Sequence, residues 1–342
     1  MSESDLVKSR LAATHVVSVV DKLAASRKGI DYATAIKRLA ELINDADIDR
    51  WHSSGAIRKK ISVVEMMVED CVKVLQDAPL TINFEPYKFF GSKVGGDKFQ
   101  SIWHRLRSKQ PGYGDLRNEA ETLMFGYDKE DQEVDGVKVG LEISKYGKVD
   151  LRPDCQPRSH SFVADIRPKY AAVNFTWATS GSAPLYGLSH FVLKDYLRFN
   201  AAFSPHDSFN VKSSSEIGSY FNLYPILANC ADFVLKQILI SARLRTPPGP
   251  PSVIPDRPIA SHEIDKGGYG TPGLCYVEAM LNSDVVFSRD VKLVRVANIE
   301  LLDKSTADPV TLKRFTVKGS TIKKNLKAFL SQHNLKTGFE YF

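Results

Sequence analysis

Glu278 is the ionisable residue whose sequence context most strongly suggests chemistry. It lies in CYVEAML (residues 275–281), where its immediate neighbours are apolar. A carboxylate inside a buried strand costs free energy unless it is paired or used, and carboxylates with perturbed pKa values are common at functional sites. A glutamate at the edge of a strand can instead point into solvent. The context therefore predicts either a functional carboxylate or an exposed strand-edge residue.

Residues 166–210 hold the other candidate residues, at the ends of short apolar runs. The runs cover residues 170–177, 185–193 and 199–203, and residues that favour turns separate the first two. Alternating apolar and polar residues between turn segments are typical of β-strands. The pattern predicts three adjacent strands, with a polar corner at residues 204–208 after the third.

Several side chains in this stretch are suited to contact a ligand. Arg167 precedes a proline and a strand, where a guanidinium can hold a phosphate through a forked contact or simply cap the strand. Ser189 and His190 are neighbours in one strand and face opposite sides of the sheet, so one can face a cleft while the other lies in the core. The Phe203 ring beside the Ser204 hydroxyl suits stacking on an aromatic ligand, although phenylalanine is also a common core residue.

Other familiar catalytic patterns are missing from the sequence. There is no GxSxG, HExxH or paired-cysteine motif, which argues against ordinary hydrolases and zinc enzymes and predicts no metal site. The four cysteines are scattered and are expected to be reduced thiols. The glycine-rich residues 91–97 lack the spacing of a phosphate-binding loop.

Composition places the chain among soluble globular proteins. It has 342 residues, of which 43% are hydrophobic and 25% charged, and it can bury a sizeable core. The net charge of +6 is a mild basic bias and does not predict nucleic-acid binding. No apolar run approaches the roughly 20 residues that span a membrane, and the first ten residues lack the apolar core of a cleaved signal peptide.

The periodicity predicts a helical N-terminal region followed by mixed helices and strands. Three helices are expected between residues 5 and 75, with a break at Gly29. The further predicted elements are strands at 80–86, 274–281 and 291–298, helices at 99–109, 116–125, 215–244 and 322–330, an exposed hairpin within 132–158 and a loop at 245–273. We therefore divide the chain into a helical region (1–78), a central domain (79–300) and a basic C-terminal region (301–342).

Several short motifs, in order, resemble a bacterial family related to mono-ADP-ribosyltransferases. That family includes secreted effectors, among them enzymes that modify host ubiquitin on threonine. The resemblance covers about residues 80–296 and rests on LTINFEP, RNEAETLMFG, RPKYAAVNF, SAPLYGLSHFVLK, AAFSPHDSF and YVEAMLNSDVVFSRDVKLV.

The resemblance implies an α+β fold in which two small sheets surround a cleft for NAD, the substrate that donates ADP-ribose. It implies that Glu278 is the catalytic carboxylate and that the cofactor-binding residues are Arg167, Ser189, His190, Phe203, Ser204 and Ser208. Three positions depart from the family pattern. Glu85 and Lys88 stand where His and Arg are usual, which shifts the phosphate-binding role to Arg167. Tyr276 stands where arginine-modifying relatives have Gln or Glu, so arginine is not the preferred acceptor.

We therefore expect a protein mono-ADP-ribosyltransferase whose acceptor is a host protein, with a threonine of ubiquitin as one candidate. The resemblance also implies synthesis in the bacterial cytoplasm and delivery into a host cell by a route that needs no signal peptide. Two alternatives stay open at this stage. One is a non-catalytic interaction protein on the same scaffold, and the other is an NAD glycohydrolase that uses water as the acceptor.

Overall fold

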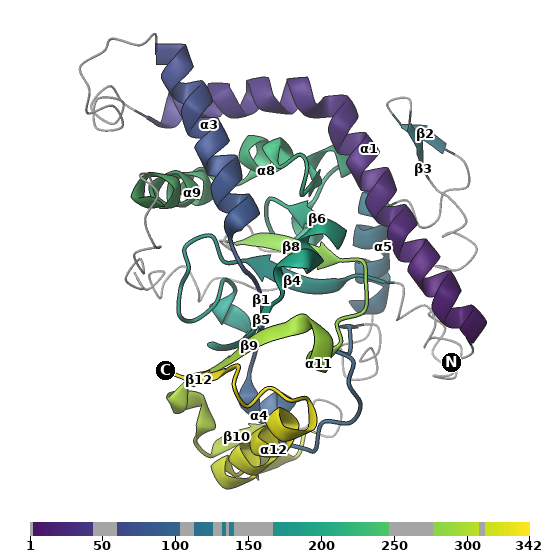
Figure 1. Cartoon of the computed structure of the whole chain (residues 1–342), viewed down its shortest axis with the longest axis vertical. Coiled ribbons are helices and arrows are strands. Elements are labelled where there is room, and N and C mark those ends of the chain that lie inside the picture. Colours follow the sequence, from purple (N-terminus) through teal and green to yellow (C-terminus); the bar gives the residue numbers. More distant parts are fainter. Residues whose placement is uncertain are drawn as a thin grey trace.

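The computed structural model describes residues 3–43, 60–102, 113–125, 132–134, 137–139, 167–245, 276–307 and 312–342. These residues form an α+β structure, as predicted, with one large mixed sheet and helices around it (Figure 1). The predicted loop at 245–273 and most of the predicted helix at 99–109 lie outside the described residues. The predicted hairpin within 132–158 is described only as the ribbon of β2 (Gln132–Val134) and β3 (Val137–Val139).

The large sheet has eight strands in the order β12-β9-β5-β1-β4-β8-β6-β7. All neighbouring pairs are antiparallel except β12 and β9, which are parallel. The strands are β1 (Leu80–Phe84), β4 (Lys169–Val173), β5 (Ser189–Leu193), β6 (Ala201–Ser204), β7 (Gly218–Ser219), β8 (Val277–Leu281), β9 (Val291–Val296) and β12 (Phe339–Tyr341).

The prediction that the three strands of residues 166–210 are adjacent is wrong. β4, β5 and β6 all form, but β1 lies between β5 and β4, and β8 lies between β4 and β6. Alternation reveals that a segment is a strand, whereas its partners are chosen by burial and packing of segments far away in the sequence. The strand that carries Glu278 is thereby inserted into the middle of this stretch.

The sheet is nearly divided between β1 and β4. These strands pair at only two positions, Leu80 with Val173 and Thr81 with Ala172. Beyond them, residues 174–188 occupy the space beside β1 and are held by Asn83, whose side-chain amide donates to the Ser180 and Gly187 carbonyls. The structure therefore has one large sheet with a narrow contact inside it, whereas the resemblance implies two small sheets.

The two faces of the sheet are covered differently. One face packs against α3 (Lys60–Asp77), α8 (Tyr224–Asn229), α9 (Asp232–Arg245) and α12 (Gly319–Gln332) in the main hydrophobic core. On the other face, a smaller apolar cluster joins Met280 and Ala202 of the sheet to Met124 and Phe125 of α5 (Tyr113–Phe125). The second face is the one that bears Glu278, because Glu278 and Met280 are two residues apart on the same strand.

The two helices predicted on either side of Gly29 form one continuous helix, and α3 corresponds to the third predicted helix. α1 (Glu3–Leu42) continues through Gly29, so the predicted break there is wrong. No atom outside the local chain lies within 4 Å of where a Cβ would stand at Gly29, and a single exposed glycine weakens a helix by only about 1 kcal/mol. α1 bends along its length and contacts α3, α8 and β7 (Figure 1).

One hydrophobic core joins segments from both ends of the chain. Buried side chains from α1 and α3, the sheet and α12 belong to the same cluster. Its centre is aromatic: the Phe191 ring lies 4.5 Å from Phe84, 5.3 Å from Phe89, 5.6 Å from Phe287 and 5.9 Å from Phe329, measured between ring centres. Aromatic contacts at these separations stabilise a core beyond the area that they bury.

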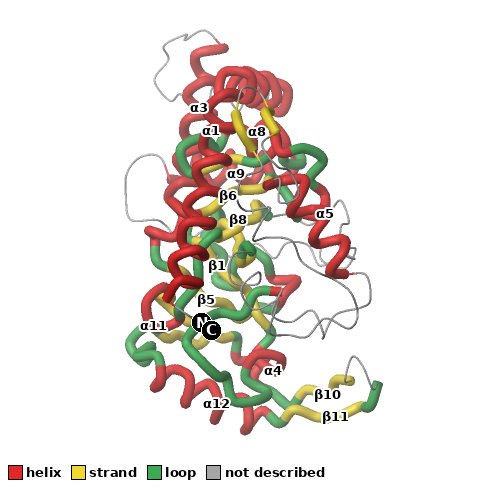
Figure 2. Tube along the Cα trace, turned by 90° about the vertical axis from the view of Figure 1, so that its right-hand side faces the viewer, coloured by secondary structure: helices red, strands yellow, loops and turns green. Residues whose placement is uncertain are grey.

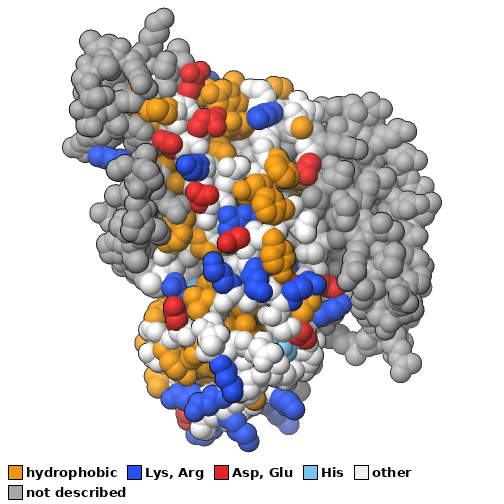
Figure 3. Space-filling view, in the orientation of Figure 1, with side chains coloured by type: hydrophobic (Ala, Val, Ile, Leu, Met, Phe, Trp, Pro, Cys, Tyr) orange, Lys and Arg blue, Asp and Glu red, His pale blue; other side chains and the backbone are white. Residues whose placement is uncertain are grey.

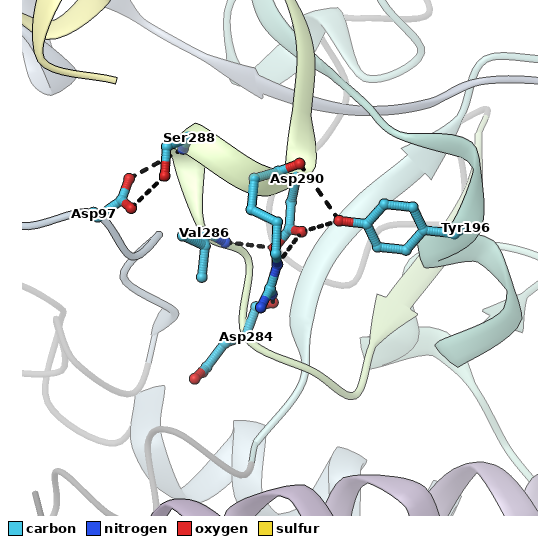
Figure 4. A network of polar contacts seen from close by, with 7 residues as sticks. Asp97, Tyr196, Asp284, Val286, Ser288 and Asp290 are labelled. Atoms are coloured by element: carbon cyan, nitrogen blue, oxygen red, sulfur yellow. Dashed lines mark hydrogen bonds and ion pairs between the residues drawn. The ribbon is translucent and has the colours of Figure 1, made fainter. Parts of the chain in front are cut away.

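A network of polar contacts fixes the short helix α11 (Phe287–Asp290) between β8 and β9 (Figure 4). The buried Asp290 carboxylate accepts hydrogen bonds from the Val286 backbone N–H at 2.6 Å and from the Tyr196 hydroxyl. The Ser288 N–H donates to Asp97 at 3.0 Å. These contacts satisfy backbone donors at the helix start and tie β8 and β9 to distant segments.

The C-terminal segment adds a short helix, a ribbon and α12. The ribbon pairs β10 (Lys304–Ala307) with β11 (Arg314–Val317), follows the 3-10 helix η6 (Asn298–Leu301) and projects from the body of the molecule (Figure 2). Asp303 links the ribbon to α12 by accepting from the Gly319 N–H at 2.8 Å and from the Lys318 ammonium at 2.9 Å. None of the described helices combines the length and the apolar character needed to cross a membrane.

Candidate functional site

Glu278 lies in the middle of the sheet, on the face opposite the main core. It is paired across the strands with Ala172 of β4 and Ser204 of β6. Only 5% of its surface is exposed, so the alternative of a solvent-facing edge residue is wrong. A buried carboxyl group in this position requires polar partners.

Asp207 and Tyr276 provide two of these partners. The Tyr276 hydroxyl oxygen lies 3.4 Å from Glu278 Oε1 and 3.3 Å from Asp207 Oδ2. A tyrosine hydroxyl has one proton and can donate to only one of the two carboxylates. The second contact becomes a hydrogen bond when one carboxyl group carries a proton and donates it to the tyrosine oxygen.

The protonation of Glu278 fits this geometry. Burial and the neighbouring negative charge of Asp207 raise the pKa of Glu278 from 4.5 to about 7, although Arg117 and hydrogen bonds from Ser208 oppose the shift. Near neutral pH the Glu278 carboxyl group therefore exchanges between its charged and neutral forms. Groups poised in this way can stabilise positive charge or transfer a proton.

Ser208 and Arg117 complete the surroundings of the carboxyl group. The Ser208 backbone N–H donates to Glu278 Oε2 at 2.9 Å, and the Ser208 hydroxyl accepts from Arg117 at 2.7 Å. The Arg117 guanidinium lies 3.7 Å from the centre of the Phe209 ring and 4.5 Å from that of Tyr170. α5 therefore places a buried cation close to Glu278, held by two aromatic rings.

The short segment after β6 positions both Asp207 and Ser208. Asp207 precedes the 3-10 helix η4 (Ser208–Asn210), and its side chain accepts from the Phe209 N–H at 2.9 Å. This turn directs the Ser208 N–H towards β8 and leaves the second Asp207 oxygen for the tyrosines. The polar corner predicted at residues 204–208 is present, and it also brings a second carboxylate, that of Asp207, close to Glu278.

Tyr186 is the most exposed member of this group. Its hydroxyl lies 3.4 Å from Asp207 Oδ2, and 40% of the residue is exposed. The Tyr186 ring meets the Tyr276 ring edge to face, with 6.4 Å between the ring centres. Tyr186 thus lies between solvent and the pair of carboxyl groups.

Arg167 is occupied by a buried ion pair. Its guanidinium lies 2.7 Å from Glu121 of α5 and 2.8 Å from the Asn118 side chain, and 1% of the residue is exposed. Glu121 also accepts from the Tyr170 hydroxyl. The arrangement ties α5 to the start of β4, so Arg167 acts as a structural link in this structure and does not present its guanidinium to solvent.

Ser189 and His190 lie away from Glu278. They are on β5, and both β1 and β4 lie between β5 and β8, which corresponds to roughly 14 Å at the usual strand spacing. The Ser189 hydroxyl donates to Glu300 at 2.6 Å, and the ring nitrogen Nδ1 of His190 lies 3.1 Å from the Leu188 carbonyl oxygen. Burial lowers the pKa of His190 to about 4, which keeps the ring neutral.

Phe203 and Ser204 are separated by the sheet itself. Phe203 is paired with Ala279 and belongs to the main core, so its ring lies on the opposite face from Glu278. Ser204 lies directly across from Glu278. Its hydroxyl oxygen is buried and has no hydrogen-bond partner among the described residues, and such an atom is a candidate ligand contact.

The structure therefore brings together Glu278, Ser204 and Ser208 of the predicted residues. Arg117 and Asp207 were not predicted as site residues, and Tyr276 was considered only for acceptor choice. The polar residues clustered in SPHDSF were a visible signal for Asp207. Nothing in the sequence links Arg117 on α5 to the strand that carries Glu278, because this contact depends on how α5 packs.

The arrangement suits a cationic or electron-poor substrate centre next to a carboxylate. Ser204 Oγ and Arg117 Nε are both buried without hydrogen-bond partners among the described residues, which fits a polar ligand such as the ribose of NAD.

In the part of the chain that the structure describes, no cluster of three or more His, Cys, Asp or Glu residues could hold a metal ion. No family model matches the sequence, and no curated protein matches it significantly.

Proposed function

We propose that this protein is a mono-ADP-ribosyltransferase that transfers ADP-ribose from NAD to a protein side chain, with Glu278 as the catalytic carboxylate. The observation that carries the proposal is the buried Glu278 carboxyl group, whose pKa is raised to about 7 beside Asp207 and Tyr276. Such a carboxyl group costs stability, and a function that uses its charge explains why it is there.

The reaction breaks the bond between the ribose and the nicotinamide. The bonding electrons leave with nicotinamide, and positive charge develops on the ribose carbon and ring oxygen, as at a glycosidic centre. A carboxylate at Glu278 stabilises that charge in surroundings that exclude water. The acceptor oxygen then bonds to the ribose carbon and loses its proton, which the carboxylate can accept.

Contacts in the structure support new roles for several residues. Ser204 lies across from Glu278, its hydroxyl has no hydrogen-bond partner in the described part of the chain, and it is suited to bind a ribose hydroxyl. Arg117 is the buried cation close to Glu278 and replaces Arg167 as the choice for an anionic part of NAD. The half-exposed Tyr186 ring replaces Phe203 as the surface on which nicotinamide stacks.

The sheet geometry is compatible with a fold of the ADP-ribosyltransferase type. β12, β9, β5 and β1 form one half, β4, β8, β6 and β7 form the other, and only two residue pairs join them. We propose that the acceptor is a host protein reached after export, with a threonine of ubiquitin as one candidate. Tyr276, two residues before Glu278, contacts Glu278 directly, in keeping with an acceptor other than arginine.

A second candidate function is NAD hydrolysis without a protein acceptor. The observation in its favour is Asp207, because a second carboxylate beside Glu278 can orient or deprotonate a water molecule. This enzyme would release nicotinamide from NAD in the absence of any protein acceptor.

The test is to incubate the purified protein with NAD, with and without host-cell lysate, and to measure nicotinamide release and ADP-ribosylated peptides by mass spectrometry. Glu278→Gln should lower the rate by about 100-fold or more, whereas Glu119→Gln on the exposed face of α5 should not. The rate should rise with pH through about 7, because the charged form of Glu278 is required.

These measurements, together with calorimetric titration with NAD, distinguish the three candidate functions. Labelled protein in the lysate supports the transferase, and nicotinamide release that is independent of the lysate supports the hydrolase. No NAD binding at about millimolar concentration, a typical upper limit for substrate affinity, would reject both and favour a non-catalytic interaction protein.

A further inference from the structure

The positive charge of the chain is concentrated in its C-terminal segment. Residues 301–342 contain eight Lys and Arg residues and three Asp and Glu residues, a net charge of +5, whereas the whole chain has +6. The remaining 300 residues are therefore almost neutral. The mechanism proposed above uses none of these basic residues.

The basic side chains are exposed on the ribbon and on one side of α12. Lys323, Lys324 and Lys327 are exposed, whereas Ile322 and Leu326 of the same helix are buried in the main core. Figure 3 shows Lys and Arg side chains gathered at the lower end of the molecule, where Figure 1 places β10 and α12. This cluster, which we call the basic surface, comprises Lys304, Lys313, Arg314, Lys323, Lys324 and Lys327.

The described residues provide no acidic partner for the basic surface. None of its six members forms an ion pair with an acidic side chain of that part of the chain. Asp303, which precedes Lys304, is already paired with Lys318. Glu340 is paired with Arg295. The positive field of the surface is therefore directed to solvent.

Large apolar side chains are exposed beside these cations. Leu312 next to β11 is 76% exposed, and Phe315 within β11 is 49% exposed. Ile299 and Leu302, at the base of the ribbon, are 69% and 61% exposed. The ribbon, which carries Phe315, projects from the body of the molecule and stands apart from the large sheet (Figure 2).

We propose that the ribbon and α12 bind a membrane surface rich in anionic lipid headgroups. Lysine and arginine are attracted to the negative surface potential, while exposed leucine and phenylalanine side chains enter the boundary between headgroups and acyl chains. Cations together with exposed apolar side chains favour lipid over nucleic acid, because a phosphate backbone offers the apolar side chains no partner. Binding at a surface requires no membrane-spanning helix.

The first experiment is sedimentation of the full chain with vesicles of phosphatidylcholine alone or with about 30 mol % phosphatidylserine. The proposal expects the protein to pellet with the anionic vesicles and to remain in solution with the neutral ones. Binding should fall steeply at about 0.5 M NaCl, since salt screens exposed charges. Equal binding to both vesicles, or no binding to either, overturns the proposal.

Two variants identify the residues involved. Lys313→Glu with Arg314→Glu should lower the affinity for anionic vesicles by about tenfold or more, because each basic residue near the surface contributes about fivefold. The control is Lys37→Glu with Lys236→Glu, which changes the net charge by the same amount. These two positions are exposed, on α1 and α9 at the other end of the molecule, so the control variant should bind like the parent protein. Equal losses in both double variants would show a response to net charge alone and contradict the proposal.

A separate variant tests how much the exposed apolar side chains contribute to vesicle binding. Phe315→Ser should weaken binding to anionic vesicles while leaving the charge unchanged, and unaltered binding would remove the apolar part of the proposal. Circular dichroism of each variant checks that the fold is intact. Vesicle binding requires no NAD, so this result is independent of the proposed transferase activity.

Discussion

The carboxyl group of Glu278 makes the stability of the fold depend on pH. Its pKa is 4.5 without perturbation and about 7 in the folded chain, because it is buried beside Asp207. The folded state therefore holds this proton more tightly than the unfolded state. The stabilisation is fully present below pH 4.5 and is lost as pH rises to 7.

Replacing Glu278 with Gln should therefore stabilise the protein only at high pH. At pH 8 the variant should be more stable than the parent by about 2–3 kcal/mol, because a neutral amide avoids the cost of a buried charge. At pH 5 the two proteins should be nearly equal. Urea unfolding at both pH values measures the difference, and Glu119→Gln is the exposed control. A stability difference between Glu278→Gln and the parent that does not change with pH would show that Glu278 does not titrate as described.

The buried pair of Arg167 and Glu121 predicts a different kind of defect. Arg167→Ala should destabilise the fold by about 3–5 kcal/mol, because it leaves the Glu121 carboxylate buried without its cation. Adding Glu121→Gln should recover part of this loss, which a double-mutant cycle measures by urea unfolding. Arg243→Ala, on the exposed side of α9, is the control. If Arg167 served only to bind NAD, Arg167→Ala would instead lower the affinity for NAD and leave the free energy of unfolding unchanged.

At the scale of elements, the Asn83 side chain holds the segment that follows β4 against β1. Asn83 donates to the Ser180 carbonyl at 2.7 Å and to the Gly187 carbonyl at 2.8 Å, and it accepts from the Ala183 N–H at 3.2 Å. These three contacts hold residues 174–188, which carry Tyr186 to the candidate site. An amide NH₂ group donates two hydrogen bonds while the amide oxygen accepts a third, whereas a hydroxyl can donate only one.

Asn83→Ala should loosen this segment and lower stability by about 2–3 kcal/mol, because it leaves backbone groups without partners. Hydrogen exchange should show faster exchange of the Ala183 amide, with little change in β6. Asn298→Ala, at an exposed position of η6, should change neither quantity. Unchanged exchange at Ala183 in the Asn83 variant would mean that the segment is held by other contacts.

Most strands and helices could be predicted from the sequence, whereas their pairing could not. The alternation around residues 170, 190 and 202 correctly indicated β4, β5 and β6. The helical prediction for 215–244 is confirmed by α8 and α9 but is wrong at its start, where β7 forms. Periodicity contains no information on which distant strand lies between two others, so the insertion of β1 and β8 was missed. Gly29 was a misleading break signal because the packing of α1 outweighs the weak helix propensity of one residue.

Only some residues of the candidate site could be predicted from the sequence. Glu278 stood out because an acidic residue among apolar neighbours is unusual, whereas Ser204 and Ser208 were assigned by the family resemblance. The resemblance also assigned Ser189 and Phe203 to the site. The inserted strand separates β5 from the site, and the alternation of side chains sends Phe203 to the opposite face.

At the scale of the whole molecule, the described residues share a single main core. Leu39 of α1 and Leu326 of α12 are both fully buried in it, although they come from opposite ends of the chain. The helical N-terminal region, the sheet and the C-terminal helix therefore support one another. Segments that share a core are expected to lose their structure together.

Leu39→Ala and Leu326→Ala should consequently lower the midpoint of the same unfolding transition. Each should cost about 2–5 kcal/mol, since each leaves a cavity in a packed core. The two residues lie in distant elements, so their effects should be nearly additive in the double variant. Calorimetry and far-ultraviolet circular dichroism should agree on one transition, and Leu302→Ala at an exposed position should leave it unchanged. If Leu39→Ala instead splits off an earlier transition, residues 1–78 fold as a unit of their own, and the contacts between α1 and α8 contribute little to the stability of the sheet.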